Sequence, residues 1–566
     1  MKQIIINLLQ KSLKEKKIKL KEEEIENLIE TPPSSEIGDY AFPCFFLSKI
    51  LKQNPNKIAE DFSKKIKITK EIEKIESKGP YLNFFINKKK LAENIISEIL
   101  KQKENYGKII LKKPIKTMVE FSSPNTNKPL HLGHLRNMAI GESISRILEF
   151  NGEKVIKTSL NNDRGIHICK SMAAYKNYGK GKTPDLEKKK SDHFVGDFYV
   201  MFNNFLKKNN NLEAESQLLL QKWEKGDKET ISLWKKMNKW ALEGFHETYK
   251  KFGIKFDYEF FESSFYKKGK EIIEQGLKSK VFERTEDGAV KIDLEKEKLG
   301  EKILLRKDGT SVYVTQDLYL AKLKFEKYKI DKSIYVVGNE QNYHFNVLFT
   351  ILKKLGFEKE MHHLSYGMVE LPEGKMKSRE GIVIDADDLI DNVQKLVKNE
   401  LVKRQKLSGK ELEKRSLIIS LASIKYMLLK VDVKKDMLFN PKESISFEGD
   451  TGPYLQYSYA RASSILKKVK IKKDKFKIDK LENEEFNLSK KLSEFPEVIS
   501  KSYKSLNPSA IANYSYQLSQ IFNEFYHKCP VINSEKSFFR FSLVNAFRQT
   551  LKNSLYLLGI EAIDRM

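Results

Sequence analysis

The sequence predicts an α/β body built on a parallel sheet, with an α+β unit before it and an all-α helical bundle after it. Two observations predict this arrangement. Residues 114–160 follow the pattern strand, loop, helix, strand, which is typical of a βαβ unit with parallel strands. Beyond about residue 386 the strand pattern fades and amphipathic helices with short connections follow one another, which favours an antiparallel bundle. We therefore divide the chain into three domains, residues 1–110, 111–385 and 386–566.

The first domain combines helical stretches near both of its ends with two segments of a different character. The segment GDYAFPCFFLSKIL, from Gly38 to Leu51, is compact and rich in glycine, proline and aromatic residues. The segment GPYLNFFIN, residues 79–87, indicates a turn that enters a strand, because its residues are strong β-formers.

The central domain alternates strands with helices. PIKTMVEF is a buried strand, SSPNTNKP a loop, HLGHLRNMAIGESISRILEF a helix with apolar residues at helical spacing, and VIKTSL the next strand. A lysine-rich, mostly helical stretch at about 170–250 indicates an insertion. Strand-like runs then return as SVYVTQ, SIYVVG, HHLSYGMVEL and GIVID. The third domain contains amphipathic helices at 389–401, 417–429, 454–466, 511–526 and 538–558.

The composition excludes several classes of protein and leaves one alternative open. No stretch of about eighteen apolar residues predicts a membrane span. The three cysteines, Cys44, Cys169 and Cys529, lie far apart without metal-binding spacing, which disfavours a disulfide framework or a zinc site and favours a cytoplasmic protein. The net charge of +27 suits a polyanionic partner, but an AT-rich genome would also enrich lysine. Charge alone leaves these two explanations equal.

Residues 122–137, SSPNTNKPLHLGHLRN, carry the strongest chemical pattern. His131, Gly133 and His134 stand where a loop turns into a helix, and the unpaired N–H groups of a helix N-terminus attract phosphate. Gly133 has no side chain, so a nucleotide can approach the backbone closely. The two histidines, three residues apart, are placed to donate hydrogen bonds to a reacting α-phosphate. The alternative, two unrelated surface histidines, does not explain the strand–loop–helix context.

This segment resembles the HIGH signature of class I aminoacyl-tRNA synthetases, and VEFSSPN followed by KPLHLGHLRN is similar to their arginine-specific branch. The resemblance covers nearly the whole chain, in the family's order, through LNNDRG, YVTQDLYLA, VVGNEQNYHF, GKMKSREG, DTGPYLQYSYARASSIL and LLGIEAIDRM. It implies a Rossmann-type catalytic domain, an N-terminal domain that approaches the tRNA elbow, and a helical C-terminal domain that binds the anticodon.

The resemblance also assigns roles to individual residues. It implies catalysis by His131, His134, Lys128, Lys375 and Lys377, and ATP binding by Pro124, His131, Gly133, His134, Lys375, Met376, Lys377 and Ser378. It implies arginine binding by Glu120, Ser123, Asn125, Glu262, Tyr313, Asp317 and Gln341. It implies tRNA binding by Asn83, Phe84, Tyr454, Tyr457, Tyr459 and Arg461. It assigns no residue to a bound metal.

The arginine site has a physical rationale, and two departures from the family stand beside it. Guanidinium is a fork of donors that pairs with carboxylate, and Tyr313 and Asp317, four residues apart, share a face if a helix begins at Tyr313. The second family signature, KMSKS, appears here as KMKSR at 375–379, so which cation touches the phosphates stays open. Gln316 replaces the family's arginine, and nothing in the sequence explains the change. We interpret His344, His362 and His363 as structural or ribose-side residues.

The implied reaction is the ATP- and Mg²⁺-dependent formation of arginyl-adenylate, followed by transfer to the terminal adenosine of tRNA(Arg) in the cytoplasm by a monomer. The family also implies that tRNA binds before arginine is activated. Three alternatives remain: a nucleotidyltransferase for a small metabolite, a non-catalytic tRNA-binding descendant, and a synthetase for another amino acid. The accessory domains, the intact His131 and His134, and the acidic Asp317 weigh against them in turn.

Overall fold

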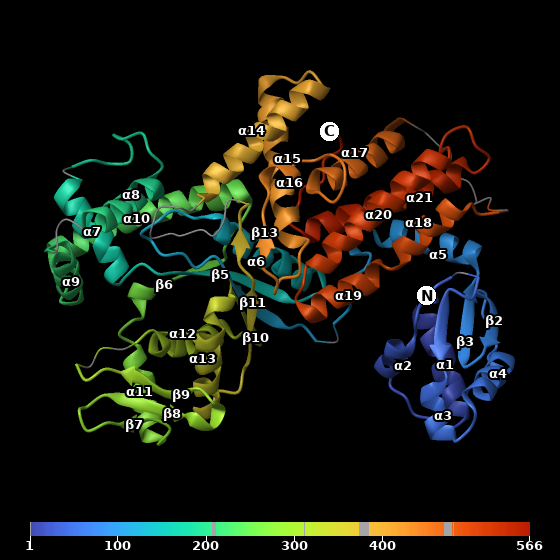
Figure 1. Ribbon diagram of the computed structural model, residues 1–566, viewed down its shortest axis with the longest axis horizontal. Helices are drawn as coiled ribbons and strands as arrows, with labels where there is room; N and C mark the ends of the chain where they lie inside the picture. The colour runs from blue at the N-terminus through green and yellow to red at the C-terminus, as the bar shows by residue number, and fades with distance from the viewer. Residues whose placement is uncertain are drawn as a thin grey trace.

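The computed structural model describes residues 2–34, 36–111, 113–179, 181–206, 211–308, 310, 312–372, 384–468, 478 and 480–566. Figure 1 shows a central α/β body, a helical extension on its left, a helical bundle at the upper right and a separate small unit at the lower right. The predicted fold class is confirmed, because a parallel central sheet stands between an α+β unit and an all-α bundle.

The N-terminal unit is a three-stranded antiparallel sheet covered by helices. β3 pairs with β1 on one side and β2 on the other. Its Leu82 and Phe84 enter the core of this unit, whereas Ile86 packs against Leu91 and Phe486. The side chain of Asn54 caps α4, which begins at a proline, as helix starts favour. The elements are α1 (Lys2–Glu15), α2 (Glu22–Leu28), β1 (Tyr40–Pro43), α3 (Phe45–Leu51), α4 (Pro55–Lys65), β2 (Ile72–Lys78) and β3 (Tyr81–Ile86).

The central sheet is parallel throughout, in the order β11-β10-β4-β5-β6. The strands are β4 (Lys116–Glu120), β5 (Lys154–Asn161), β6 (Tyr258–Phe261), β10 (Lys332–Gly338) and β11 (Glu360–Tyr366). The chain adds β5 and β6 on one side of β4, and β10 and β11 on the other, so the winding reverses between β4 and β10. Parallel sheets bind ligands at the carboxyl ends of strands beside such a switch point.

The helices around this sheet follow the predicted pattern with one exception. The helix expected after the SSPNTNKP loop is α6 (Leu132–Phe150), and the extension contains α7 (Ile166–Tyr178), α8 (Ser191–Leu206), α9 (Asn211–Glu224) and α10 (Lys228–Phe252). The strand-like reading of SVYVTQ is wrong. Val312 is the N-cap of α12 (Tyr313–Tyr328), and Val314, Leu318 and Ala321 pack at helical spacing into an apolar cluster. α13 (Asn342–Lys354) follows β10.

A second small sheet, which the sequence did not reveal, lies at the lower left of Figure 1. It is antiparallel, in the order β7-β8-β9, and packs with α11, α12 and α13 around one apolar cluster. The strands are β7 (Glu283–Arg284), β8 (Val290–Leu294) and β9 (Gly300–Leu305), and α11 (Gly269–Lys278) precedes them. The catalytic body also has 3-10 turns at Glu262–Ser264, Glu295–Glu297 and Asn339–Gln341.

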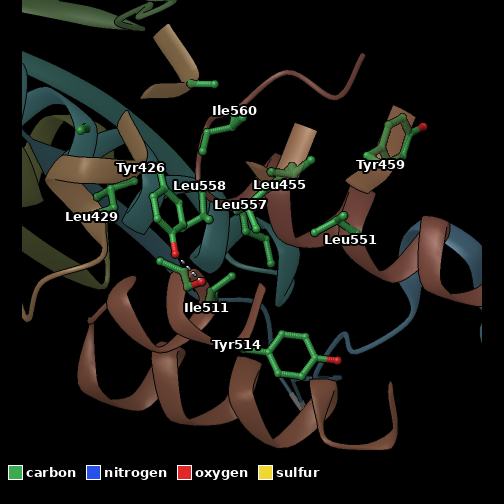
Figure 2. Close-up of a cluster of buried hydrophobic side chains, with 14 of the residues drawn as sticks. Tyr426, Leu429, Leu455, Tyr459, Ile511, Tyr514, Leu551, Leu557, Leu558 and Ile560 are labelled. Carbon is green, nitrogen blue, oxygen red and sulfur yellow. Dashed lines mark hydrogen bonds between the residues drawn. The ribbon is translucent and has the colours of Figure 1, made fainter. Parts of the chain in front are cut away.

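The C-terminal bundle shares one large core with the catalytic body. Figure 2 shows part of it, where side chains from α15, α17, α20, α21 and the C-terminal segment meet. α5 (Lys88–Gln102), which follows the N-terminal sheet, also packs into this core rather than the N-terminal one. The helices are α14 (Ala386–Arg404), α15 (Gly409–Leu429), α16 (Pro441–Ser444), α17 (Gly452–Lys468), α18 (Asn483–Ser493), α19 (Phe495–Ser505), α20 (Ser509–Lys528) and α21 (Ser537–Leu557).

The protein also contains two short strands, a further 3-10 turn and three buried cysteines. β12 (Val369–Glu370) and β13 (Met437–Leu438) form a parallel pair, and Lys103–Asn105 form a 3-10 turn after α5. The three cysteines are free thiols inside the protein, and burial raises their pKa values. Within the described residues, no helix has the length and apolar character that crossing a membrane requires.

Candidate active site

A cavity of about 530 Å³ opens at the carboxyl ends of β4, β5 and β10, where the winding of the sheet reverses. All seven residues predicted to bind arginine line this cavity, although the chain distributes them over 222 positions from Glu120 to Gln341. Gln316, the departure from the family pattern, is buried and lines the same cavity.

The start of α6 holds His131 and His134 in a fixed relation. The N–H of Gly133 donates to Nδ1 of His131, and the N–H of His131 donates to Nδ1 of His134, each across 3.1 Å. Because both Nδ1 atoms accept, a neutral ring carries its proton on Nε2. A Cβ at Gly133 would lie 2.9 Å from Cε1 of His131, so glycine is required for this packing.

Both imidazoles are held neutral. Burial lowers the pKa of His131 to about 4, with a further decrease from Lys128 and a smaller opposite effect from Asp385. Burial lowers the pKa of His134 well below its usual value, and the neighbouring His131 and Lys128 add to this. Two neutral N–H donors at a helix N-terminus stabilise negative charge without first losing a proton.

The turn after β4 is strained in a way that serves the cavity. Ser122 and Ser123 both have positive φ, at 67° and 47°, a conformation that is uncommon outside glycine and concentrates at functional sites. The hydroxyl of Ser123 accepts from the N–H of Leu160 at 3.3 Å, which ties the turn to β5. The carbonyl of Pro124 accepts from the N–H of Asn162 at 3.0 Å. The turn is thereby fixed at the rim, with Asn125 beside it.

The opposite wall carries Asp317 and Tyr313, which lie on α12 as the four-residue spacing predicts. Oδ2 of Asp317 lies 2.7 Å from Nε2 of His344, and each of these side chains is 29% exposed. The hydrogen bond to Asp317 raises the pKa of His344 and outweighs the effect of burial. We interpreted His344 as structural or ribose-side, but it contacts the carboxylate predicted to bind guanidinium.

Glu262 supplies a second carboxylate to the same cavity. It is buried after β6, with Oε1 3.6 Å from a guanidinium nitrogen of Arg164. Burial raises the pKa of Glu262 to about 7; Arg164 opposes the increase, and the charges of Asp317 and Asp163 add to it. A cation placed in the cavity would relieve this repulsion and favour the ionised form.

Glu120 already has a partner. Oε2 of Glu120 lies 2.7 Å from Nζ of Lys324, whose side chain is fully buried and lies over the ring of Tyr335. Burial lowers the pKa of Lys324, but Glu120 and Tyr335 outweigh that effect and raise it. The sequence contained a signal for this lysine, because it occupies the apolar stripe of α12 beside Leu320 and Phe325.

The KMKSR segment, with Lys375, Met376, Lys377, Ser378 and Arg379, lies outside the described residues. Its downstream flank is described and is attached to the start of α6. The N–H of Leu132 donates to the carbonyl of Ile384 at 3.1 Å, and the N–H of Ala386 donates to the carbonyl of Leu130 at 2.9 Å. The structure therefore places Ile384 and Ala386, which follow the second signature in the chain, beside the first signature.

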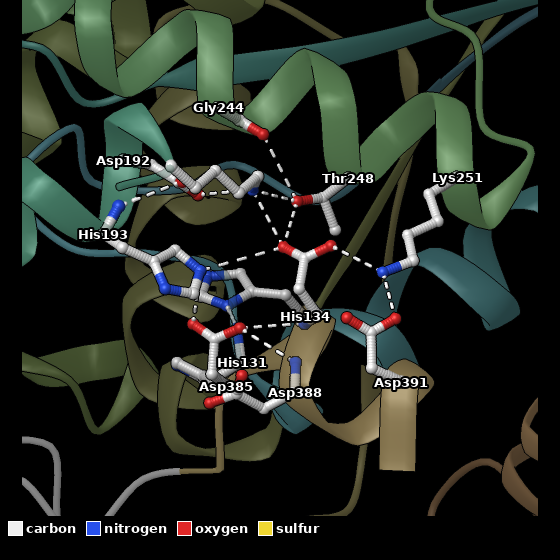
Figure 3. A network of polar contacts seen from close by, with 12 residues as sticks. His131, His134, Asp192, His193, Gly244, Thr248, Lys251, Asp385, Asp388 and Asp391 are labelled. Atoms are coloured by element: carbon white, nitrogen blue, oxygen red, sulfur yellow. Dashed lines mark hydrogen bonds and ion pairs between the residues drawn. The ribbon is translucent and has the colours of Figure 1, made fainter. Parts of the chain in front are cut away.

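A charged network fixes this junction (Figure 3). Nε2 of His193, on α8, lies 3.2 Å from Oδ2 of Asp385, which caps α14. Asp192, His193 and Asp387 have the donor atoms of a metal site within 4.8 Å. The ammonium of Lys190 lies between the two carboxylates, 3.0 Å from Asp192 and 2.8 Å from Asp387, and so provides the positive charge that these carboxylates require.

We expect a His193→Gln substitution to lower the midpoint of thermal unfolding by roughly 3–6 °C at pH 6. Burial lowers the pKa of His193, but the neighbouring carboxylates of Asp385 and Asp387 outweigh it and raise the pKa to about 10. A raised pKa means that the stabilisation is complete below about pH 6.5 and is lost as pH rises towards 10. The difference between wild type and variant should therefore shrink between pH 6.5 and 9.5 in a series of unfolding scans. His527→Gln, at an exposed histidine of α20, is the control; a difference that grows with pH would contradict the network.

The residues predicted to contact tRNA in the N-terminal unit require a correction. Asn83 is 2% exposed and Phe84 is fully buried in the core of that unit. Neither side chain can stack on a base in this structure, so these two predictions are wrong. Their neighbour Phe85 is half-buried and lies under the ammonium of Lys74.

The residues predicted in the bundle separate into two groups. Tyr459 is 3% exposed and belongs to the core, as Figure 2 shows, so its prediction as an RNA contact is wrong. Tyr454, Tyr457 and Arg461 are partly exposed on α17. The guanidinium of Arg461 donates to the hydroxyl of Tyr457 at 2.8 Å and lies over two tyrosine rings, those of Tyr457 and Tyr526.

Comparison with known families gives three matches that follow one another along the chain. The N-terminal domain of arginyl tRNA synthetases matches residues 3–86. The family model described as "tRNA synthetases class I (R), catalytic domain" matches residues 95–441. The DALR anticodon binding domain matches residues 455–566.

Whole proteins match over the same span. An arginine–tRNA ligase of Treponema denticola is 50% identical and covers 95% of this chain and 94% of its own length. One from Borrelia hermsii is 46% identical and covers 99% and 98%. The solved structure of the arginyl-tRNA synthetase of Thermus thermophilus superposes with a TM-score of 0.85 at 25% identity, over 100% of both chains.

Proposed function

Because the chain belongs to the arginyl-tRNA synthetase family, we propose that the cavity beside β4 and β10 is its arginine site and the start of α6 its ATP site. The protein is an arginine–tRNA ligase of class I, with arginine, ATP and tRNA as its partners. The observation that supports the two sites best is an acidic cavity at the switch point of the sheet, next to two neutral histidines.

In the arginine site, the guanidinium of the substrate pairs with Asp317, and Glu262 adds negative charge from the opposite side. Carboxylate is the natural partner of this planar fork of donors. Tyr313 and Gln341 bound the same space, and the turn with Ser123 and Asn125 contacts the amino-acid end of the substrate. Glu120 takes part through its ion pair with Lys324, which fixes its orientation.

In the ATP site, the α-phosphate lies at the N-terminus of α6. The Nε2–H groups of His131 and His134 donate to oxygens of the α-phosphate, where negative charge accumulates as the arginine carboxylate attacks. Lys128 adds positive charge, and the phosphates that leave as pyrophosphate are bound by Lys375 and Lys377, with Pro124, Gly133, Met376 and Ser378 completing the site. ATP enters as its Mg²⁺ complex.

The second step is the transfer of arginine to tRNA. A hydroxyl of the terminal adenosine, the 2′-hydroxyl in class I enzymes, attacks the carbonyl carbon of arginyl-adenylate, and AMP leaves. The partly exposed Tyr454, Tyr457 and Arg461 contact the anticodon arm, because aromatic rings and guanidinium groups stack on unpaired bases. No covalent enzyme intermediate is required, since positioning and electrostatics suffice.

The proposal also covers the roles of the domains, the oligomeric state and location, and the order in which substrates bind. The chain comprises an elbow-contacting domain at 1–110, a catalytic domain at 111–385 with a helical insertion at about 170–250, and an anticodon-binding domain at 386–566. It acts as a monomer in the cytoplasm, where three buried, unpaired cysteines persist without oxidation. Arginine is activated only after tRNA has bound, as the resemblance to the family implies.

The proposal is tested by aminoacylation of total tRNA with each of the twenty radiolabelled amino acids, ATP and Mg²⁺. We expect charging with arginine alone, at least about a hundredfold above the next amino acid, because a site built for guanidinium leaves buried carboxylates unpaired with other substrates. Omission of ATP is the control and should abolish charging.

Two outcomes would contradict the proposal. Binding of tRNA without any charging would favour a non-catalytic tRNA-binding protein. Formation of an adenylylated small molecule without charged tRNA would favour a nucleotidyltransferase.

A further inference from the structure

His344 and Asp317 form the closest contact between a histidine and a carboxylate in the arginine cavity. Nε2 of His344 lies 2.7 Å from Oδ2 of Asp317, and both side chains line the cavity. The two residues come from different helices, α13 and α12. The pair therefore depends on how these helices pack, and not on local spacing in the sequence.

The guanidinium of arginine and the imidazole of His344 both donate to the carboxylate of Asp317. A bidentate pair uses both oxygens of a carboxylate, and here one of them already accepts from His344. An imidazolium left beside a bound guanidinium would face a like charge at short range, which disfavours its protonated form. Arginine and a protonated His344 are thus two cations that compete for the charge of one carboxylate.

We infer that His344 is a positioning residue which holds Asp317 in the empty site and yields its oxygen to arginine, so that arginine binding releases a proton from His344 to water. The inference rests on the assignment of Asp317 to the guanidinium. In the empty site, protonated His344 occupies the place of the substrate guanidinium and keeps the side chain of Asp317 from turning towards other donors.

The surroundings of this pair define what else titrates there. Besides the pair itself, the ionisable groups that line the cavity, or contact the pair from neighbouring elements, are Glu120, Arg164, His167, Glu262, Tyr313, Lys324, Tyr335 and His363. Burial lowers the pKa of His363, and its Nε2 bonds the carbonyl of Val337 at 3.0 Å. Lys324 is occupied by Glu120. Glu262, with a pKa near 7, also loses its proton more readily when a cation binds.

The direction of the pH effect follows from the raised pKa of His344. Below that pKa His344 is protonated and competes with arginine, so the KM for arginine should rise by up to about tenfold per pH unit as pH falls. Above it the KM should level off. Glu262 adds a dependence of the same sign, which remains when His344 is replaced.

The test is the KM for arginine in aminoacylation between pH 6 and 8.5, at saturating ATP and tRNA, for wild type and His344→Gln. Glutamine cannot carry the competing charge, so we expect the variant to have a KM about five- to tenfold below wild type at pH 6 and similar to wild type at pH 8.5. A defect in folding or packing would not make arginine bind more tightly at low pH. Calorimetry of arginine binding to the tRNA-bound protein in two buffers of different ionisation enthalpy counts the released protons directly.

Matched variants separate the possible failures. His527→Gln, at an exposed histidine of α20 outside the cavity, should behave as wild type. If His344→Gln keeps the wild-type pH profile and proton release, or if His167→Gln abolishes them instead, the inference is wrong. If Asp317→Asn leaves the KM for arginine unchanged, the assignment of Asp317 to the guanidinium fails, and the inference fails with it.

Discussion

Replacement of Asp317 by asparagine is expected to lower kcat/KM for arginine by roughly 100- to 1,000-fold, which corresponds to about 3–4 kcal/mol of transition-state stabilisation. The substitution keeps the shape of the side chain but removes the charge, and it turns an amide NH₂ towards the guanidinium. Asp317 is only 29% exposed, so water replaces the lost interaction poorly. Aminoacylation kinetics with varied arginine measure the effect, most of which should appear in the KM for arginine.

The KM for ATP separates a local effect from a general one. ATP is proposed to bind at the start of α6, away from Asp317, and its KM should change by less than about threefold. Asp293→Asn is the matched control, because Asp293 is exposed on β8 outside the cavity. Equal losses for arginine and ATP would indicate a damaged fold and would remove Asp317 from the arginine site.

The catalytic body could be predicted because its signals are local. Strand β4, the loop after it and helix α6 follow one another without interruption, and the alternation of buried strand and amphipathic helix appears within about forty residues. The resemblance then brought together residues from Glu120 to Gln341 that no spacing argument connects. The cavity that all seven line reflects the winding of the sheet, which returns β10 to the side of β4.

Partners chosen by tertiary packing could not be predicted. His344 appears ordinary in the sequence, and Lys324 stands out only as a charge in the apolar stripe of α12. The packing of α12 against β4 and α13 is what places Lys324 beside Glu120 and His344 beside Asp317. The β7–β9 sheet was also missed, since its short strands alternate with charged residues at a surface.

Exposure was the least predictable property of all. The sequence did not show which side chains of β3 face outward, and Leu82, Asn83 and Phe84 are all buried. Tyr459 was placed on an RNA-binding surface together with Tyr454 and Tyr457, although a step of two residues on a helix turns a side chain to a different face.

Replacement of Arg136 by methionine is expected to destabilise the protein by about 3–5 kcal/mol, a large fraction of the stability of a typical protein. Arg136 is fully buried in α6, and its guanidinium donates to the carbonyls of Gly367, Met368 and Lys435, each at 2.7 Å. Methionine fills the volume of the aliphatic stem but leaves these carbonyls buried without a donor. Burial lowers the pKa of Arg136 to about 10, so the charge persists at neutral pH.

Urea unfolding followed by tryptophan fluorescence suits this test, because Trp223, Trp234 and Trp240 all lie in the helical extension of the catalytic body. Arg146→Met, ten residues further along α6, is the matched control. Its guanidinium is partly exposed and pairs with Glu142, so its loss should cost about 1 kcal/mol or less. Arg136→Lys should fall between the two, since one ammonium cannot reproduce the planar fork that reaches two loops at once.

Equal stability of Arg136→Met and wild type would show that the two loops are held by other contacts. The expected order, Met below Lys below wild type, would instead identify Arg136 as the link between the first signature helix and the loop at Gly367, which leads along the chain to the KMKSR segment.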